Sequence, residues 1–360
     1  KWPTLGSLGF QTGAGIMSRS MMLFAAMLLL AGCDFLAIRG GLGASVANVS
    51  KAYFSANMFL NHAATNPVFS FLTSLGDHTD YAAEYPFFDE AGREERFAPL
   101  RGNNPSAAAP ERVLTTPRPN VVVVILESFA RTVMDADVGG LPVMPNMQRL
   151  KGEGIWFENF FANSFRTDRG EVAILSGFPA QTRMSIMKLP AKSRNLPSLA
   201  RSLSGAGYAT GFSYGGDLNF TDQASYMYAT GWQQLTWQKD LRFDTPPADW
   251  GYDDAVMCDW FADRVIALSG KGEPFLAGML TLSSHRPFDV PFSKFDDKEL
   301  NAFAAPGGIA GNFGTGWCDY SGLSENALWF GGELLHLEER VEIERPPSGP
   351  LEPWNLYSAS

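Results

Sequence analysis

The stretch "NVVVVILESF", residues 120–129, decides the fold class. Its five consecutive β-branched residues, from Val121 to Ile125, are typical of a strand that is buried on both faces, as in a parallel sheet. Glu127 follows at the carboxyl end, where a carboxylate can face a pocket and hold a divalent cation. Taken alone, a glutamate after an apolar strand is as often the first acidic residue of a helix.

Helices and strands alternate downstream of this stretch. A helix and a strand are expected in residues 144–163, and again in residues 197–214. Residues 253–268 predict an amphipathic helix, and residues 274–285 contain another buried strand. This alternation predicts a doubly wound α/β domain over residues 118–300, with a mostly parallel central sheet flanked by helices.

Two further polar residues end predicted strands. Asp217 follows two glycines, which allow close backbone approach, and His285 follows the buried strand. A histidine there can contact a substrate oxygen or act as a general acid. Alone, Asp217 is an ordinary turn aspartate and His285 a surface histidine, but ligands of such sheets bind beyond the carboxyl ends of the strands. Together with Glu127 they indicate a site at that edge.

The stretch "NSFRTDRGEVAILSG", residues 163–177, allows two interpretations of Thr167. Threonine is a good helix N-cap, although Glu171 lies one position too late for a capping box. Alternatively, its hydroxyl is a nucleophile at a helix N-terminus beside a metal ion. Arg166 and Arg169 would then bind phosphate oxygens, whereas the other possibility is that both are solvated.

The N-terminal region divides into an apolar part and a mixed part. Residues 1–40 contain the apolar run 21–33, which predicts a transmembrane helix or a secretory signal. The residues "LAGC" that end at Cys33 also match a lipoprotein-type cleavage box. The other possibility is a buried core helix. Residues 41–117 predict a helical juxtamembrane region, with an apolar face that packs or rests on a membrane surface, and then a linker.

The composition excludes several classes of protein. A formal net charge of −10 without a Lys/Arg cluster argues against nucleic-acid binding. Three scattered cysteines do not form a disulfide framework, and four histidines make a His-rich zinc site improbable.

Five blocks, in order, resemble the sulfatase-like domain of the lipoteichoic acid synthase family, phosphoglycerol transferases of the alkaline phosphatase superfamily. They are "RPNVVVVILESF", the run from "MPNMQRL" to "LSGFP", "LPSLARSLSGAGYATGFSYGGDLNF", "WGYDDAV" and "FLAGMLTLSSHRPF". The resemblance implies Thr167 as nucleophile and metal ligand, Glu127 as metal ligand and His285 as a substrate contact. Asp217, Arg166 and Arg169 are softer substrate-binding assignments. "RTDRG" replaces the Cys/Ser-x-Pro-x-Arg motif of true sulfatases, which disfavours sulfate-ester hydrolysis.

The resemblance also implies a reaction and a location. The implied reaction is transfer of phosphoglycerol from a phospholipid such as phosphatidylglycerol to a cell-envelope acceptor. The implied cofactor is a divalent metal, Mn²⁺ before Mg²⁺ or Zn²⁺. The catalytic domain would lie outside the cytoplasm of a bacterial cell membrane, on its periplasmic or outer face. Two alternatives remain: a phosphoethanolamine transferase or phosphodiesterase on the same scaffold, and a non-catalytic remnant.

The chain departs from the family near residue 301. Family members complete the metal site with an Asp-His pair, and no such pair follows Thr167; Asp77-His78 lies upstream in the linker. Residues 301–360 are glycine-rich, then charged and proline-rich. We expect an aberrant, frameshifted tail that leaves the domain incomplete at its C-terminal end, weakens metal binding and leaves core strands unpaired.

Overall fold

The computed structural model describes residues 13–43, 45–75, 83, 86–98, 116–157, 160–181, 184–304, 327–331 and 334–337. The chain forms two compact units, Lys1–Asn48 and Val49–Ser360. The first contains α1 (Gly13–Arg39), in which Arg19–Arg39 is long and apolar enough to cross a membrane. This stretch buries nothing inside the structure, so the possibility of a buried core helix is not supported.

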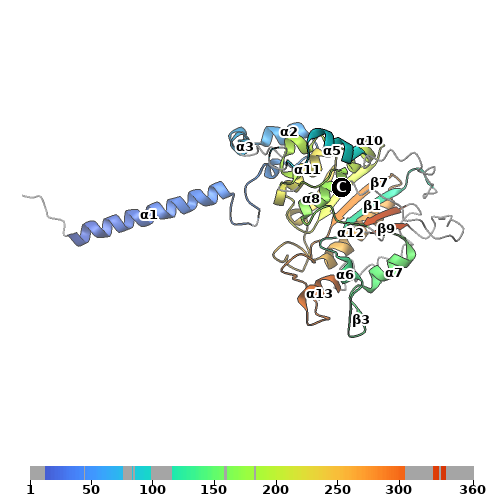
Figure 1. Ribbon diagram of the computed structural model, residues 1–360. Coiled ribbons are helices and arrows are strands. Elements are labelled where there is room, and N and C mark those ends of the chain that lie inside the picture. The colour runs from blue at the N-terminus through green and yellow to red at the C-terminus, as the bar shows by residue number, and fades with distance from the viewer. Residues whose placement is uncertain are drawn as a thin grey trace, which may run out of the picture. The chain divides into compact units, whose positions relative to one another are not determined.

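The second unit is built on a seven-stranded sheet with the order β4-β9-β8-β1-β7-β5-β6 (Figure 1). Strands β8, β1, β7, β5 and β6 are mutually parallel, whereas β9 runs antiparallel to both of its neighbours, β8 and β4. A separate two-stranded ribbon pairs β2 with β3. The strands are β1 (Asn120–Ile125), β2 (Asp137–Val138), β3 (Leu141–Pro142), β4 (Ile155–Trp156), β5 (Ala209–Tyr214), β6 (Gln234–Trp237), β7 (Phe275–Leu280), β8 (Ala327–Gly331) and β9 (Leu334–Leu337).

Helices cover both faces of this sheet. The described helices of the unit are α2 (Met58–Ala64), α3 (Pro67–Ser74), α5 (Glu90–Phe97), α6 (Arg131–Met134), α7 (Pro145–Glu153), α8 (Thr167–Ser176), α9 (Pro190–Ser193), α10 (Leu199–Gly205), α11 (Gln223–Ala229), α12 (Asp254–Ser269) and α13 (Lys298–Ala304). Short 3-10 turns are η1 (Val49–Ala52), η3 (Ile186–Lys188), η4 (Phe220–Asp222) and η5 (Gln238–Asp240).

Strand β1 contributes to both hydrophobic cores because its successive side chains point to opposite faces. Val122 and Val124 pack in the core that contains residues of α7, α12 and α13. Val121, Val123 and Ile125 pack in the core that contains residues of α8, α10 and α11. All six residues of β1 are buried, which confirms the α/β class and the doubly buried strand.

The parallel register brings three strand ends to one edge of the sheet. In β7, Leu280 pairs with Ile125 of β1 and with Tyr214 of β5. Glu127, Asp217 and His285 follow these strands, so all three lie beyond the same carboxyl edge, as predicted from the sequence.

The sheet continues into the region expected to be aberrant. Strand β8 pairs in parallel with β1 along Asn120–Val124, and β9 follows antiparallel to β8. The expectation that loss of the family's C-terminal end leaves a core strand such as β1 unpaired is therefore wrong, because residues 327–331 occupy its free edge. Apart from residues 327–331 and 334–337, the residues after 304 lie outside the described residues, as does the Asp77-His78 pair, and the frameshift stays a prediction.

Candidate active site

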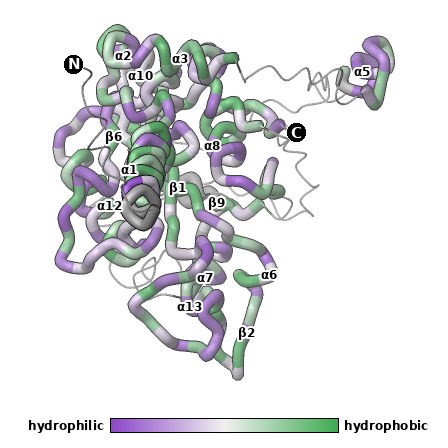
Figure 2. Tube along the Cα trace, turned by 90° about the vertical axis from the view of Figure 1, so that its left-hand side faces the viewer, coloured by the Kyte–Doolittle hydropathy of each residue, from purple (hydrophilic) through white to green (hydrophobic). Residues whose placement is uncertain are grey.

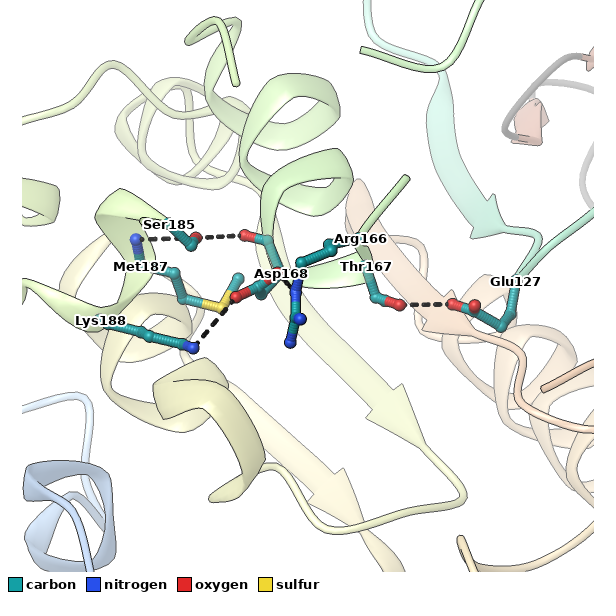
Figure 3. Close-up of polar contacts among 7 residues, drawn as sticks. All are labelled: Glu127, Arg166, Thr167, Asp168, Ser185, Met187 and Lys188. Atoms are coloured by element: carbon teal, nitrogen blue, oxygen red, sulfur yellow. Dashed lines mark hydrogen bonds and ion pairs between the residues drawn. The ribbon is translucent and has the colours of Figure 1, made fainter. Parts of the chain in front are cut away.

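Thr167 opens helix α8 at the carboxyl edge of the sheet. Its Oγ1 donates a 2.8 Å hydrogen bond to Oε2 of Glu127, which lies just beyond β1 (Figure 3). The N-cap of α8 is Arg166, and no side chain of the described residues caps the helix. The interpretation of Thr167 as the N-cap is wrong, because the residue already has helical geometry and its hydroxyl binds across the fold.

Glu127 is held in place by its own surroundings. Its backbone N–H donates to Thr281 Oγ1 at 2.8 Å, which ties the turn after β1 to the end of β7. Ser128, whose φ of 59° lies in the left-handed region, donates from Oγ to Glu127 Oε1 at 2.9 Å. Both carboxylate oxygens of Glu127 therefore accept a hydroxyl hydrogen bond, and Glu127 does not begin a helix, since α6 starts at Arg131.

Asp168 points away from the Thr167–Glu127 pair (Figure 3). It is buried, and its carboxylate lies 3.4 Å from Arg166 Nε and 3.6 Å from Lys188 Nζ. Ser185 Oγ donates to the backbone oxygen of Asp168 at 2.7 Å. Arg166 is therefore bound to a neighbouring carboxylate, although half of its side chain remains exposed.

Arg169 is buried on α8, with 7% of its surface exposed. Its guanidinium lies over the ring of Phe165, 5.6 Å from the centroid. It also lines a small hollow with Phe178, Gln181 and Ser185. The possibility that both arginines are solvated is therefore wrong for Arg169.

Glu171 lies one helical turn after Thr167 and was not predicted as a site residue. Its side chain is 1% exposed, and neither carboxylate oxygen has a hydrogen-bond partner within the described part of the chain. Burial, followed by the charges of Glu127 and Asp168, raises the pKa of Glu171 well above its ordinary value. A buried carboxylate without a partner is costly, and a nearby cation would relieve that cost. The sequence signal was its i+4 spacing from Thr167.

Asp217 and His285 reach the same edge but do not bond to Thr167 or Glu127 in the described structure. Asp217 accepts from the backbone N–H and the side-chain Nδ2 of Asn219, both at 2.9 Å, as a turn aspartate does. The His285 ring lies edge-on to Trp250, with centroids 4.5 Å apart, and its Nδ1 is 2.7 Å from the Arg286 oxygen.

The pKa of Tyr214, at the end of β5, is affected by the acidic residues at this edge. Burial raises its pKa first, and the carboxylates of Glu171, Glu127, Asp254 and Asp217 raise it further. Four acidic residues from four parts of the chain thus act on one phenol. The end of β5 therefore lies among acidic side chains from several elements.

Asp254 is a second acidic residue that sequence reasoning missed, although the block "WGYDDAV" contains it. It is buried at the start of α12 and accepts from the backbone N–H groups of Leu282 and Ser283 at 2.8 and 2.9 Å. Burial raises its pKa to about 6, partly offset by those two hydrogen bonds. Asp254 therefore fastens α12 to the loop that carries His285.

The residues at the carboxyl edge of the sheet supply only part of the ligand set that a divalent cation needs. Glu127 and Thr167 offer oxygen ligands, and Glu171 is a carboxylate that lacks a partner. Across the residues that the structure describes, no three His, Cys, Asp or Glu side chains come together in a way that could hold a metal ion. The described residues alone do not complete a metal site.

Comparisons with known proteins agree with this fold. Residues 119–303 match the Sulfatase family model. The chain is 28% identical over 188 residues to phosphoglycerol transferase I of Salmonella arizonae, and 27% identical over 202 residues to that of Salmonella paratyphi B. These alignments cover 49% and 52% of this chain but only 24% and 26% of the relatives, so the chain spans about a quarter of their length.

Two solved structures share the fold. A protein of the alkaline phosphatase superfamily from Vibrio parahaemolyticus superposes with a TM-score of 0.57 and 22% identity, over 69% of this chain and 63% of that one. The lipoteichoic acid synthase LtaP from Listeria monocytogenes gives 0.57 and 18%, over 66% and 61%. The fold is that of the alkaline phosphatase superfamily. Since the family model covers half of the chain, the protein belongs to the sulfatase family, and the resemblance to its lipoteichoic acid synthase-like members is confirmed.

Proposed function

We propose that this chain is a phosphotransferase that moves phosphoglycerol from a phospholipid to a cell-envelope acceptor, with Thr167 as its nucleophile. The observation that carries the proposal is the hydrogen bond from Thr167 Oγ1 to Glu127 Oε2 at the carboxyl edge of the sheet. Similarity to phosphoglycerol transferases supports the choice of transferred group.

The reaction would proceed in two displacements. Thr167 Oγ attacks the phosphorus of a phosphatidylglycerol-like donor, forming the Thr–O–P bond while the P–O bond to diacylglycerol breaks. The hydroxyl proton leaves toward Glu127, and the departing alkoxide takes up a proton to become diacylglycerol. An acceptor hydroxyl then attacks the same phosphorus while the Thr–O–P bond breaks, and its proton passes to the departing Thr167 oxygen, which restores the hydroxyl.

A divalent cation, with Mn²⁺ preferred over Mg²⁺ or Zn²⁺, would use Glu127 and Thr167 as two of its ligands. When bound, it would neutralise negative charge on the transferring group. The four carboxylates around Tyr214 favour a cation at this edge, because an anionic phosphodiester alone would be repelled there.

His285, Asp217, Arg166 and Arg169 remain proposed substrate contacts. Ser283, His285 and Asp289, which follow β7, line one hollow with Trp250, which precedes α12. Half-exposed Arg166 can turn toward a phosphate, since a guanidinium binds phosphate oxygens in pairs. Arg169 is buried against Phe165, so it would contact substrate only after a side-chain movement.

We also propose that α1 anchors the chain in a bacterial cell membrane, with the catalytic unit outside the cytoplasm. The apolar stretch Arg19–Arg39 supports the anchor. A lipid donor would then lie in the bilayer that holds the enzyme.

Mass spectrometry of the chain after incubation with phosphatidylglycerol and Mn²⁺ tests the function. We expect a glycerophosphate adduct on Thr167 and release of diacylglycerol, both lost in Thr167→Ala. An ethanolamine phosphate adduct from phosphatidylethanolamine would instead support the transferase alternative, and water-dependent release without an adduct the phosphodiesterase. Equal inactivity of the chain and Thr167→Ala would contradict the proposal and favour a non-catalytic remnant.

A further inference from the structure

Helices α2 and α3 form an apolar surface that nothing in the described structure covers. Helix α3 has the sequence PVFSFLTS, and none of its residues is buried. Phe59 in α2 is 76% exposed, and Phe71 in α3 is 62% exposed. The exposed large apolar side chains of this surface, which we call the α2–α3 face, are Phe59, Leu60, Val68, Phe71, Leu72 and Leu75.

The α2–α3 face is fastened to the catalytic unit rather than loosely attached. Ser50 in η1 is fully buried; its N–H donates to Asp222 at 3.2 Å, and its Oγ accepts from the Ser225 N–H at 2.8 Å. Asn61 of α2 is also buried and accepts from the N–H groups of Phe54 and Ser55. These bonds fix η1 against α11 and tie α2 back to the segment that follows η1, and both α2 and α3 lie along the top of the unit in the two views (Figures 1 and 2).

The absence of charged residues indicates which kind of surface the α2–α3 face can bind. Residues 52–76 contain no Asp, Glu, Lys or Arg. Interfaces between proteins keep a polar rim, whereas an uncharged, phenylalanine-rich helical surface suits the boundary between lipid headgroups and acyl chains. Contiguous exposed apolar patches mark interaction sites.

The segment after α1 also limits how far the α2–α3 face can lie from a bilayer that α1 spans. Residues 40–57 join α1, which is apolar enough to span a membrane, to the start of α2. A fully extended linker of this length reaches no further than about 60 Å. Such a tether makes membrane contact intramolecular, so a small apolar face suffices for docking.

We propose that the α2–α3 face docks into the surface of the lipid bilayer and fixes how the catalytic unit stands on the membrane. Because the face carries no basic side chain, docking depends on apolar contact and not on anionic lipids. The proposal rests on α1 as the anchor and is independent of the chemistry at Thr167.

Site-specific fluorescence quenching in nanodiscs tests the docking. The full chain carries an environment-sensitive fluorophore on Phe71→Cys, with Cys33 and Cys318 replaced by serine; Cys258 is buried. A matched chain carries the label on Glu273→Cys, an exposed position of the same unit. With nitroxide-labelled lipids, we expect the label at position 71 to lose more than half of its emission, equally in zwitterionic and anionic discs, and the label at position 273 to lose none.

A double variant, Val68→Glu with Leu72→Glu, should restore the emission of the label at position 71 to that of the control label. Because the side chains of Val68 and Leu72 are both exposed, the double variant should fold as the parent chain does. Three results would overturn docking: equal emission at both positions, quenching that requires anionic lipid, or a chain that does not associate with discs. Shielding seen only when several chains share one disc would identify a second copy as the occupant and overturn it equally.

Discussion

Thr167 and Glu127 are 40 residues apart in sequence, yet a 2.8 Å hydrogen bond joins the start of α8 to the end of β1. The hydroxyl therefore serves no helix cap, and its proton already faces a carboxylate. Within the described residues no group donates to the Thr167 oxygen, so its lone pairs can meet an electrophile or a cation.

Replacing Glu127 with Gln is expected to weaken Mn²⁺ binding at least tenfold while leaving the fold intact. The amide oxygen can still accept from Thr167, but the negative charge that attracts a hard cation is lost. Titration of Mn²⁺ followed by electron paramagnetic resonance measures this directly, with Glu273→Gln as the control for an exposed carboxylate of the same unit. Unchanged Mn²⁺ affinity in Glu127→Gln would show that the cation binds elsewhere.

Glu171→Gln is expected to raise the free energy of unfolding of the metal-free protein at pH 7 by about 1–3 kcal/mol. The wild-type carboxylate is buried without a partner, and a neutral amide of the same shape is less costly to bury. Denaturant unfolding at fixed ionic strength gives the comparison.

The pH dependence of the Glu171→Gln effect follows from the direction in which the pKa of Glu171 is shifted. Because the pKa of Glu171 is raised above its ordinary value of 4.5, the folded state holds the proton longer than the unfolded state does. Stability from this group is therefore lost as pH rises above about 4.5, and the advantage of Glu171→Gln should grow with pH. An advantage that is the same at pH 4 and pH 8 would mean that Glu171 is paired. Added Mn²⁺ should reduce the advantage if the cation lies near Glu171.

The sheet and its functional edge were predictable because they depend on local pattern. Five β-branched residues in a row identify β1, and polar residues directly after apolar strands identify the edge. The partner of Thr167 was not predictable from helix rules, since capping propensity describes neighbours within a turn and Glu127 lies 40 residues upstream.

Glu171 and strand β8 show why the rest was missed. Glu171 reads as a surface residue of a polar first turn, and only the packing of α8 against the sheet buries it. Residues 327–331 lie in a glycine-rich region without a clear period, and they become a strand through pairing with β1. Strand formation depends on such tertiary contacts more than on intrinsic preference.

Gly251→Ala is expected to destabilise the protein by more than about 3 kcal/mol and to disturb the loops that carry Asp217 and Trp250. Gly251 has a φ of 144°, and an added Cβ would lie 2.2 Å from the Gly215 oxygen. Gly272→Ala is the control, because its φ is also positive but nothing lies within 4 Å, so strain alone should cost about 1 kcal/mol. Thermal unfolding of both variants measures the difference, and equal losses would show that backbone contact is not the cause.

Ser283 and Ser284 are adjacent buried serines in the loop after β7, and within the described residues only the Ser283 hydroxyl makes a hydrogen bond. Ser283 Oγ accepts from the backbone N–H of Asp254 at 2.8 Å, where both residues are buried. Ser284 is 1% exposed, and its Oγ has no hydrogen-bond partner within the described residues. Ser283→Ala should therefore cost about 1–3 kcal/mol, because it leaves a buried N–H at the start of α12 unsatisfied.

Ser284→Ala should be neutral or slightly stabilising, since it removes an unsatisfied buried hydroxyl and little volume. Denaturant unfolding of the two variants side by side measures the difference. Because Asp254 also holds the N–H groups of Leu282 and Ser283, the loss in Ser283→Ala should loosen the loop that carries His285. Faster hydrogen exchange at residues 282–285 in that variant alone would support this. A larger loss in Ser284→Ala than in Ser283→Ala would contradict the hydrogen-bond assignment at the start of α12.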